Sequence, residues 1–416
     1  MSKTFSSLRY RNYRLFFGGQ IVSQVGSWMQ RIAMSWFVLQ ITHSAFAVGI
    51  MALASFLPFT LFGLFAGTIA DRFDARKLVI GTQTAQLVTA AALAYIALAH
   101  VAQPWMLYTI GFATGLILVL DVPSRQQLTY RMVGREALPN AIALNTSLFN
   151  ASRIFGPAVA GILYGLTGPG ICFLINAISF LAVLLGLFAM RTSEFFPIEK
   201  FARPSLLRGT REGMAYVLKD RRILVLLMLT FMLSTFTFNF NVTLPVLAYK
   251  TLDAPVFVYS VLSSLFGAGA LVGALIAASL GRASTKTLLI GALLFTGGEL
   301  LLAPVHTAWL VGTLLFVIGA GFTAWSANSN ASMQLAAPDH LRGRIIGIYF
   351  YAFNGSASLA GLMVGWLCAK GGTELAFAVA GAIGVVSTLV AAARLGATKR
   401  VILPLHRPVA TERRAA

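Results

Sequence analysis

Residues 67–77 read Gly-Thr-Ile-Ala-Asp-Arg-Phe-Asp-Ala-Arg-Lys, a dense cluster of charge between two long apolar runs. The runs on either side, residues 45–66 and 78–98, contain no Asp, Glu, Lys or Arg. Each is long enough to cross a bilayer core of about 30 Å as a helix. The charged stretch is therefore predicted to be a tight loop between two membrane helices.

The composition describes a chain that lives in lipid. Of 416 residues, 57% are hydrophobic and only 11% are charged, with a mean hydropathy of +0.79. The net charge of +19 does not indicate nucleic-acid binding, because 27 of the 32 Lys and Arg fall in alternate loops and at the termini. This asymmetry predicts a multi-pass protein of the cytoplasmic membrane with both termini in the cytoplasm.

The apolar runs predict an all-α membrane protein of twelve transmembrane helices in two pseudo-symmetric bundles of six. The expected helices span 14–41, 45–70, 78–99, 104–131, 140–166, 170–190, 222–250, 256–280, 286–305, 307–334, 342–369 and 373–394. The predicted units are a basic interfacial segment (1–13), an N-terminal bundle (14–190), a cytoplasmic linker (191–221), a C-terminal bundle (222–394) and a basic cytoplasmic tail (395–416). Weak similarity between the halves at constant offsets supports a duplication.

The charged loop resembles the signature loop of the major facilitator superfamily, whose members are twelve-helix secondary transporters. The resemblance implies a conformational switch formed by Gly67, Asp71, Arg72, Arg76 and Lys77. Gly67 and Ala70 are expected to let helix ends approach closely. Asp71 is expected to lie by the positive end of a neighbouring helix.

A second motif, Gly156-Pro157-Ala-Val-Ala-Gly161, resembles the element that marks proton antiporters in this superfamily. Together with residues 28–31 and 133–145, it is similar to the secretion-effector branch, which includes enterobactin exporters and macrolide efflux proteins. Two departures stand out. Asp74 replaces a common Gly, and residues 110–115 lack the Arg that many drug exporters carry, which puts that branch's proton relay in doubt.

Ionisable groups at membrane depth usually face a cavity or a partner. Asp121 and Arg153 are both expected near the midplane on consecutive helices, so Asp121, Arg153 and Arg125 are proton-coupling candidates. Two alternatives are a purely structural Asp121–Arg153 ion pair and an i, i+4 pair between Asp121 and Arg125. Glu299 is expected at the outer surface, because the family's third helix of each three-helix unit is peripheral.

A polar stripe recurs at helical spacing on the first helix and is expected to line the central cavity. Its counterpart on the seventh helix includes Asn241, and Asn328 and Asn354 are further candidates. The alternative for the stripe is interhelical hydrogen bonding without substrate contact. The substrate-cavity candidates are therefore Gln20, Gln24, Ser27, Arg31, Asn241, Asn328 and Asn354.

Motifs for other chemistry do not occur in the sequence. It contains no HExxH, GxSxG or GxxxxGK[ST] motif, and Cys172 and Cys368 fall inside expected helices, where packing explains them. No enzyme activity, cofactor or metal site is therefore expected.

The sequence thus predicts an exporter of small amphiphilic molecules, such as siderophore-like compounds, acidic metabolites or drugs, working by proton antiport and alternating access. The expected partners are the substrate, protons and membrane lipids, with no nucleic acid, and the chain is expected to act as a monomer. A cavity with three arginines against Asp121 favours anionic or neutral cargo over lipophilic cations. The alternatives are a nutrient or metabolite importer and a lipid translocator of the same fold.

The topology can be tested by cysteine labelling. In a variant without Cys172 and Cys368, a cysteine at Val101 should react with a membrane-impermeant reagent from outside, and one at Ser205 only from inside. A reversed pattern would contradict the whole topology.

Overall fold

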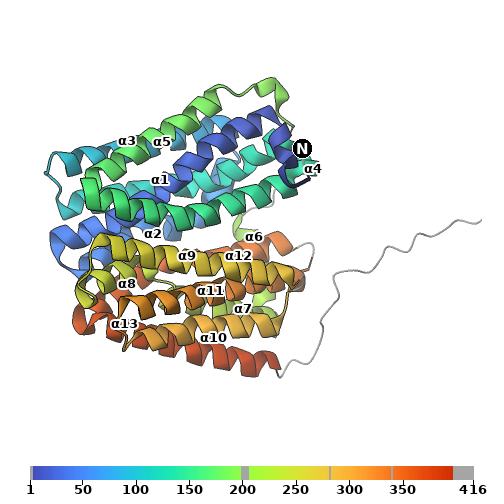
Figure 1. The fold of residues 1–416 in the computed structure, drawn as a ribbon. Coiled ribbons are helices and arrows are strands. Elements are labelled where there is room, and N and C mark those ends of the chain that lie inside the picture. Colours follow the sequence, from blue (N-terminus) through green and yellow to red (C-terminus); the bar gives the residue numbers. More distant parts are fainter. Residues whose placement is uncertain (1–2, 198–205, 281–282, 339–340, 397–416) are drawn as a thin grey trace, which may run out of the picture.

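The computed structural model describes residues 3–197, 206–280, 283–338 and 341–396, which form helices with no strand among them (Figure 1). A short helix η1 (Lys3–Arg9) precedes the first bundle, which we call the N bundle. Its helices are α1 (Arg11–Thr42), α2 (Ala45–Ala70), α3 (Ala75–Leu98), α4 (Pro104–Thr167) and α5 (Pro169–Phe188). A single turn, η2 (Thr192–Glu194), and a helix, α6 (Leu206–Lys219), lie between the bundles in sequence.

The second bundle, which we call the C bundle, begins with a discontinuous helix. It comprises α7 (Arg221–Met232), η3 (Leu233–Thr237), α8 (Phe240–Val246), η4 (Leu247–Thr251), α9 (Val256–Ser279), α10 (Thr285–Leu302), α11 (Ala308–Ala336), α12 (Arg342–Asn354) and α13 (Ala357–Gly396). In Figure 1 the N bundle lies above the C bundle, and both have their helices roughly side by side.

The predicted class, an all-α protein of twelve crossings, is confirmed. Nine stretches of the described residues are long and apolar enough to cross a membrane, and two of them, Pro104–Thr167 and Arg342–Gly396, are long enough to cross twice. The remaining crossing is α1, whose polar stripe lowers its hydropathy. The main difference from the expected boundaries is that residues 132–139 are helical, so the fourth and fifth crossings are separated only at Gly134, where a φ of 69° suits glycine.

Side chains at the loops explain where several helices begin. Ser44 accepts a hydrogen bond from the backbone N–H of Ala47 and so caps α2. Asp74 accepts one from Lys77 and caps α3 in the same way. These caps satisfy backbone donors that the first turn of a helix leaves without partners.

The seventh crossing is interrupted. Two π-helical segments, η3 and η4, flank the short α8, and Phe238 and Asn239 between η3 and α8 lie outside regular helix. Irregular backbone at membrane depth is tolerated where protein surrounds it or water lines it, and π segments often occur at functional sites. The break therefore indicates a specialised position rather than a simple crossing.

The two bundles touch each other at one end of the molecule, which we call the far end; it carries residues 43–44 and 252–255. There Gly49 of α2 meets Gly365 of α13 so closely that a Cβ added at Gly365 would lie 2.8 Å from the Cα atom of Gly49. Gly161 of α4 likewise packs against Ser260 of α9. His43 and Tyr249 complete the contact with a 2.8 Å hydrogen bond.

The contact does not continue to the opposite end, the linker end, which carries η2 and α6. Along α4, Gly161, Ile154 and Ser147 recur every seven residues and so share one face. Gly161 and Ile154 contact α9, whereas Ser147 is exposed. On α2, Thr60 bonds to Gly355 at 2.6 Å, but a Cβ added at Gly67 would meet nothing. The bundles are therefore closed at the far end and open at the linker end.

The expected close approach at Gly67 is thus absent in this conformation. Separation of the bundles at the linker end removes the surface that Gly67 would meet. Ala70, by contrast, is buried at the end of α2.

The linker contains a helix that the sequence did not predict. In α6, Val217 is fully buried, and Glu212 forms an ion pair with Arg344 of α12. A Cβ added at Gly213 would approach the Arg344 side chain to 3.2 Å. This segment is therefore packed against the C bundle through one apolar face.

Enlarging Gly161 should open the far end. In Gly161→Val, the added carbons overlap α9, so we expect the equilibrium to move toward a conformation closed at the linker end. A cysteine at Ser147, in a variant without Cys172 and Cys368, should then be alkylated severalfold more slowly. Gly165→Val is the matched control, because a Cβ there meets nothing within 4 Å. Equal alkylation in both variants would contradict the closing role of Gly161.

Candidate functional site between the bundles

Asp121 is fully buried in α4, where it faces α3 and its own helix. Its carboxylate accepts hydrogen bonds from Thr82 Oγ1 at 2.6 Å and Gln83 Nε2 at 3.0 Å. It also forms an ion pair with Arg125, one turn along α4. Arg125 in turn donates to Gln20 Oε1 of α1 at 2.7 Å. A single buried network therefore links α3, α4 and α1.

The structure decides between the two partners considered for Asp121. Arg125 supplies the countercharge, as expected for an i, i+4 pair, and Arg153 points elsewhere. The depth estimate from sequence placed Asp121 and Arg153 at similar levels, but it could not show which way each helix is turned. The Asp121–Arg153 ion pair is therefore wrong for this conformation.

Arg153 reaches from the N bundle into the C bundle. Its guanidinium carbon lies 4.7 Å from the ring centre of Phe266 in α9 and 5.4 Å from that of Phe322 in α11. Its Nη2 is buried without a hydrogen-bond partner. A guanidinium over aromatic faces is stabilised by the negative charge density of the rings. Arg153 is thus held by two rings rather than by an acid.

The rings that hold Arg153 belong to an aromatic cluster that the sequence analysis missed. Phe238, at the break in the seventh crossing, stacks on Phe322 with ring centres 4.4 Å apart. The other members surround this pair: Phe240, Phe266, Phe295, Trp325 and Phe353. They come from five separate helices and from the irregular link between η3 and α8, so no spacing along the chain reveals them. Aromatic enrichment at mid-helix was the only available signal.

The polar stripe of α1 divides into two parts. Gln20 is buried and belongs to the Asp121 network, whereas Gln24 and Ser27 are half-buried. Arg31 is exposed although it lies deep in the bundle, and its guanidinium lies 4.6 Å from the ring centre of Trp28. It is also near enough to Arg153 and Tyr259 to interact with both electrostatically. Arg31 therefore faces a space accessible to water beside Arg153.

The candidates in the C bundle occupy different surroundings. Asn328 is buried, and its amide is engaged by the backbone N–H of Ser284 and the carbonyl of Ala324. In this conformation it holds the connection between α9 and α10 rather than facing a cavity. Asn241 is half-buried in α8, and Asn354 bonds to the Phe350 carbonyl within its own helix.

The expected outer-surface position of Glu299 is wrong, since only 1% of the residue is exposed. Its helix α10 turns this face toward α11 and α13: neighbouring Gly298 packs on Ile318, and Leu300 packs on Gly381. Its Oε2 has no hydrogen-bond partner. The family's helix order suggested a peripheral helix, but a peripheral helix also has an inner face.

The charged loop is tied to the N bundle. Asp71 accepts a hydrogen bond from Gln127, and Arg76 Nε donates to the Leu187 carbonyl at 2.9 Å. Asp74 pairs with Arg131 at the linker end of α4. Partial burial raises the pKa of Asp74, but hydrogen bonds from Arg131 and the Lys77 backbone outweigh it and leave the pKa below its ordinary value. The side chains of Arg72 and Lys77 are exposed.

The antiporter-like motif, residues 156–161, lies in the second half of α4 and makes two contacts. A Cβ added at Gly156 would lie 2.3 Å from Trp28 Cβ of α1, whereas Gly161 faces the C bundle at Ser260. Pro157 is buried between them. The motif therefore brings α4 close to α1, which carries Arg31, and to the C bundle.

Two helical bundles that meet at one end, with charged and aromatic groups facing each other between them, form the architecture of a secondary membrane transporter. The sequence matches the model of the transmembrane secretion effector family over residues 2–404, and the chain belongs to this family. The family and its relatives are transporters, and the chain is a secondary transporter that exports small molecules.

Several characterised proteins are similar over most of the chain. Macrolide efflux protein A of Streptococcus pyogenes is 25% identical, covering 82% of this chain and 86% of that protein. The staphyloferrin A transporter of Staphylococcus aureus is 24% identical, covering 80% and 84%. The multidrug efflux pump Tap of Mycobacterium bovis is 26% identical, covering 94% and 95%.

Solved structures share the fold. A POT family transporter in complex with 5-aminolevulinic acid has a TM-score of 0.75 at 12% identity, covering 91% of this chain and 95% of that one. The nucleoside transporter NupG has a TM-score of 0.73 at 14% identity, covering 93% and 99%. These likenesses support the architecture of two bundles.

Removing Arg125 should destabilise the protein more than removing Arg153. Arg125→Met strands the buried Asp121 carboxylate, which typically costs about 3–5 kcal/mol, whereas Arg153→Met removes a ring contact worth about 1–2 kcal/mol. Thermal unfolding of the purified protein should show the larger drop in Tm for Arg125→Met. The double variant Asp121→Asn/Arg125→Met should recover much of it. A larger loss in Arg153→Met would restore Arg153 as the partner of Asp121.

Proposed function

We propose that the chain exports acidic or neutral amphiphilic molecules in exchange for protons, with the linker end and both termini facing the cytoplasm. The concentration of basic residues in the N-terminal segment, the linker and the C-terminal tail supports this orientation. In this orientation the structure is open to the cytoplasm, ready to take up cargo. A single chain supplies both bundles that line the proposed transport pathway.

One observation carries the choice of cargo: two arginines share the space between the bundles without an acid. Neither Arg31 nor Arg153 forms an ion pair with an acid among the described residues, and Arg125 already neutralises Asp121. Like charges repel each other, so an anionic group between the two arginines relieves an unfavourable interaction. A cationic cargo would add to it.

The aromatic cluster supplies the second half of the recognition. If an acidic group of the cargo binds Arg153, the ring faces of Phe266 and Phe322 become available to an apolar or aromatic part of the same molecule. Stacked and edge-on ring contacts add about 0.5–1.5 kcal/mol beyond burial. A molecule with an acidic group and an apolar body therefore fits the site from both bundles.

The Asp121 network is suited to respond to protons from a separate position. Gln20, which contacts Arg125, lies eleven residues from Arg31 along α1, which corresponds to about 16 Å of helix. Cargo at Arg31 therefore does not need to touch Asp121. Protonation of Asp121 would release Arg125 and with it the tie to α1, which changes how α1 and α4 pack.

Antiport follows if proton binding and cargo binding alternately drive the change between the conformation open at the linker end and the conformation open at the far end. The protonated chain would change conformation without cargo, whereas cargo between the bundles would carry the ionised chain across. Relatives described as macrolide, siderophore and multidrug transporters support export. The alternative of an importer is disfavoured by the antiporter-like motif at residues 156–161, and a lipid translocator would move labelled lipid in the assay below.

The coupling is tested by flux in proteoliposomes. Asp121→Asn should abolish uphill transport driven by a pH gradient but preserve cargo binding, whereas Arg153→Ala should lose both. Staphyloferrin A is the acidic cargo probe, and a macrolide, whose amine is cationic at neutral pH, is the contrasting probe, with a fluorescent phospholipid to detect lipid translocation. Wild-type gradient dependence in Asp121→Asn would remove Asp121 from the proton pathway. It would leave the residue as a structural tie between α3 and α4.

A further inference from the structure

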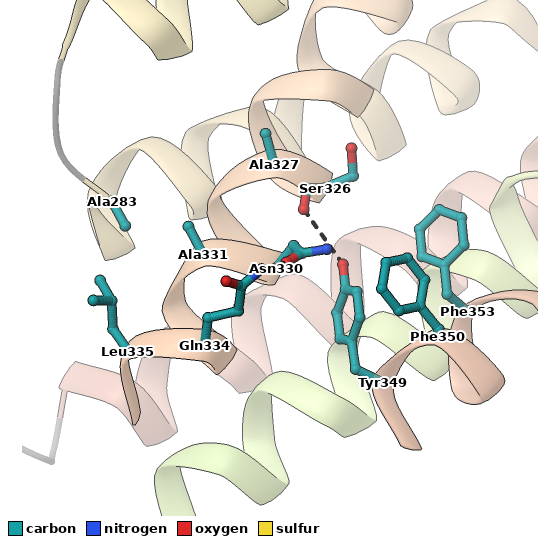
Figure 2. Close-up of a pocket in the computed structure, with 10 residues that line it drawn as sticks. All are labelled: Ala283, Ser326, Ala327, Asn330, Ala331, Gln334, Leu335, Tyr349, Phe350 and Phe353. Carbon is teal, nitrogen blue, oxygen red and sulfur yellow. Dashed lines mark hydrogen bonds between the residues drawn. The ribbon is translucent and has the colours of Figure 1, made fainter. Parts of the chain in front are cut away.

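A hollow lies within the C bundle between α11 and α12, near the linker end (Figure 2). Its volume is about 610 Å³, which is within the usual range for small-molecule sites. Its principal lining residues are Ser326, Asn330, Gln334, Tyr349, Phe350 and Phe353. Ala283, in the connection between α9 and α10, lies at its edge, so the hollow is close to the surface that we assign to the cytoplasm.

The chemistry of this hollow differs from that of the arginine site. Among the residues that the structure describes, none that lines the hollow is charged. Gln334 Nε2 donates to Asn330 Oδ1 at 2.6 Å, and Tyr349 donates to the Ser326 carbonyl at 3.3 Å. Figure 2 shows the Asn330 amide directed toward the Tyr349 hydroxyl, beside the rings of Phe350 and Phe353. Amide groups next to ring faces can bind an aromatic group with an uncharged hydrogen-bonding substituent.

An ionised group does not suit this position. Moving a charge from water into the hollow would cost desolvation, and the described lining residues offer no opposite charge to offset it. On the same helix, Ala327 and Ala331 lie beside Ser326 and Asn330, and their small side chains leave room for a flat ring. The hollow therefore selects for the uncharged part of an amphiphile.

The hollow is connected to the arginine site along one face of α11. Phe322, Ser326, Asn330 and Gln334 recur every four residues, so they form a row about 18 Å long. At the deep end of the row, Phe322 touches Arg153. Phe353 of the hollow also packs on Phe322 and Trp325, with ring centres 6.4 and 5.9 Å away. Ring faces thus continue from the hollow to the arginines.

We propose that this hollow is an entry site that binds the uncharged aromatic end of the cargo before its acidic group reaches Arg31 and Arg153. This inference rests on the proposed export of amphiphiles and narrows their class. The cargo carries an aromatic ring with a neutral hydrogen-bonding group, such as an amide or a phenol. Compounds with a charge at that end are excluded from the first step.

Photolabelling of the full chain in lipid nanodiscs tests the site directly. The probes are 4-benzoylbenzamide, which is uncharged, and 4-benzoylbenzoate, its anionic counterpart. The benzamide should attach mainly to peptides covering 326–335 and 349–353, and the benzoate should label them severalfold less. Asn330→Leu/Gln334→Leu should reduce benzamide labelling about fivefold, as expected for lost hydrogen bonds.

Ala331→Trp should block labelling by filling the hollow. If this variant does not fold, the double variant Asn330→Leu/Gln334→Leu still tests the site. Thr313→Leu is the control, because Thr313 is an exposed residue near the other end of α11. Equal labelling by both probes, or labelling that is unchanged in the double variant, would overturn the entry site.

Export measured in parallel separates the two proposals. Export by the wild type without labelling of the hollow would overturn the entry site alone. A labelled hollow without proton-driven export would overturn the proposed function and leave the binding site.

Discussion

Contact between small residues at the far end fixes the relation between the two bundles, and the other features of the structure depend on it. Lipid tails are as apolar as leucine, so membrane helices associate mainly through close packing. Gly49 against Gly365 and Gly161 against Ser260 allow backbones to meet where larger side chains would hold them apart. Because these contacts end before Ser147 and Gly67, the bundles diverge toward the linker end and leave the space that contains the arginines.

That space explains how charge is tolerated at membrane depth. Each arginine is stabilised in a different way: Arg125 is neutralised by Asp121, and Arg153 lies against the rings of Phe266 and Phe322. Arg31 lies on Trp28 and remains accessible to water. The proton-coupling candidate and the cargo candidates are therefore separate groups of residues. Both groups have members on α1 and α4, so a change in the packing of these two helices would reach both without direct contact between cargo and Asp121.

Much of the fold follows from the sequence, because the lengths of the apolar runs predict the crossings and the positions of the basic residues predict the topology. The loop at residues 67–77 was identified by its charge between apolar runs and the glycines of α4 by a resemblance to a family motif, and the structure places Gly161 where the bundles meet. What spacing could not supply is the direction in which each helix face points. Asp121 and Arg153 have similar depth but different faces, and Glu299 is on an outer helix but turns inward.

Contacts between distant segments were hidden for a related reason. Phe238, Phe322 and Phe353 meet only after the seventh, tenth and eleventh crossings pack together. The linker helix α6 was missed because its charged residues resemble those of a solvated loop. Its buried face is set by Val217 and by the pairing of Glu212 with Arg344, which lies far away in sequence.

The most direct test of alternating closure is a pair of distance measurements by electron–electron double resonance in nanodiscs. One spin-label pair, at Ser147 and Ala278, spans the open linker end, and the other, at Val101 and Thr307, spans the far end. Between high and low pH, and between the parent and Gly161→Val, the first distance should shorten as the second lengthens. Distances that change in the same direction, or a first distance that stays fixed while the second changes, would contradict the account.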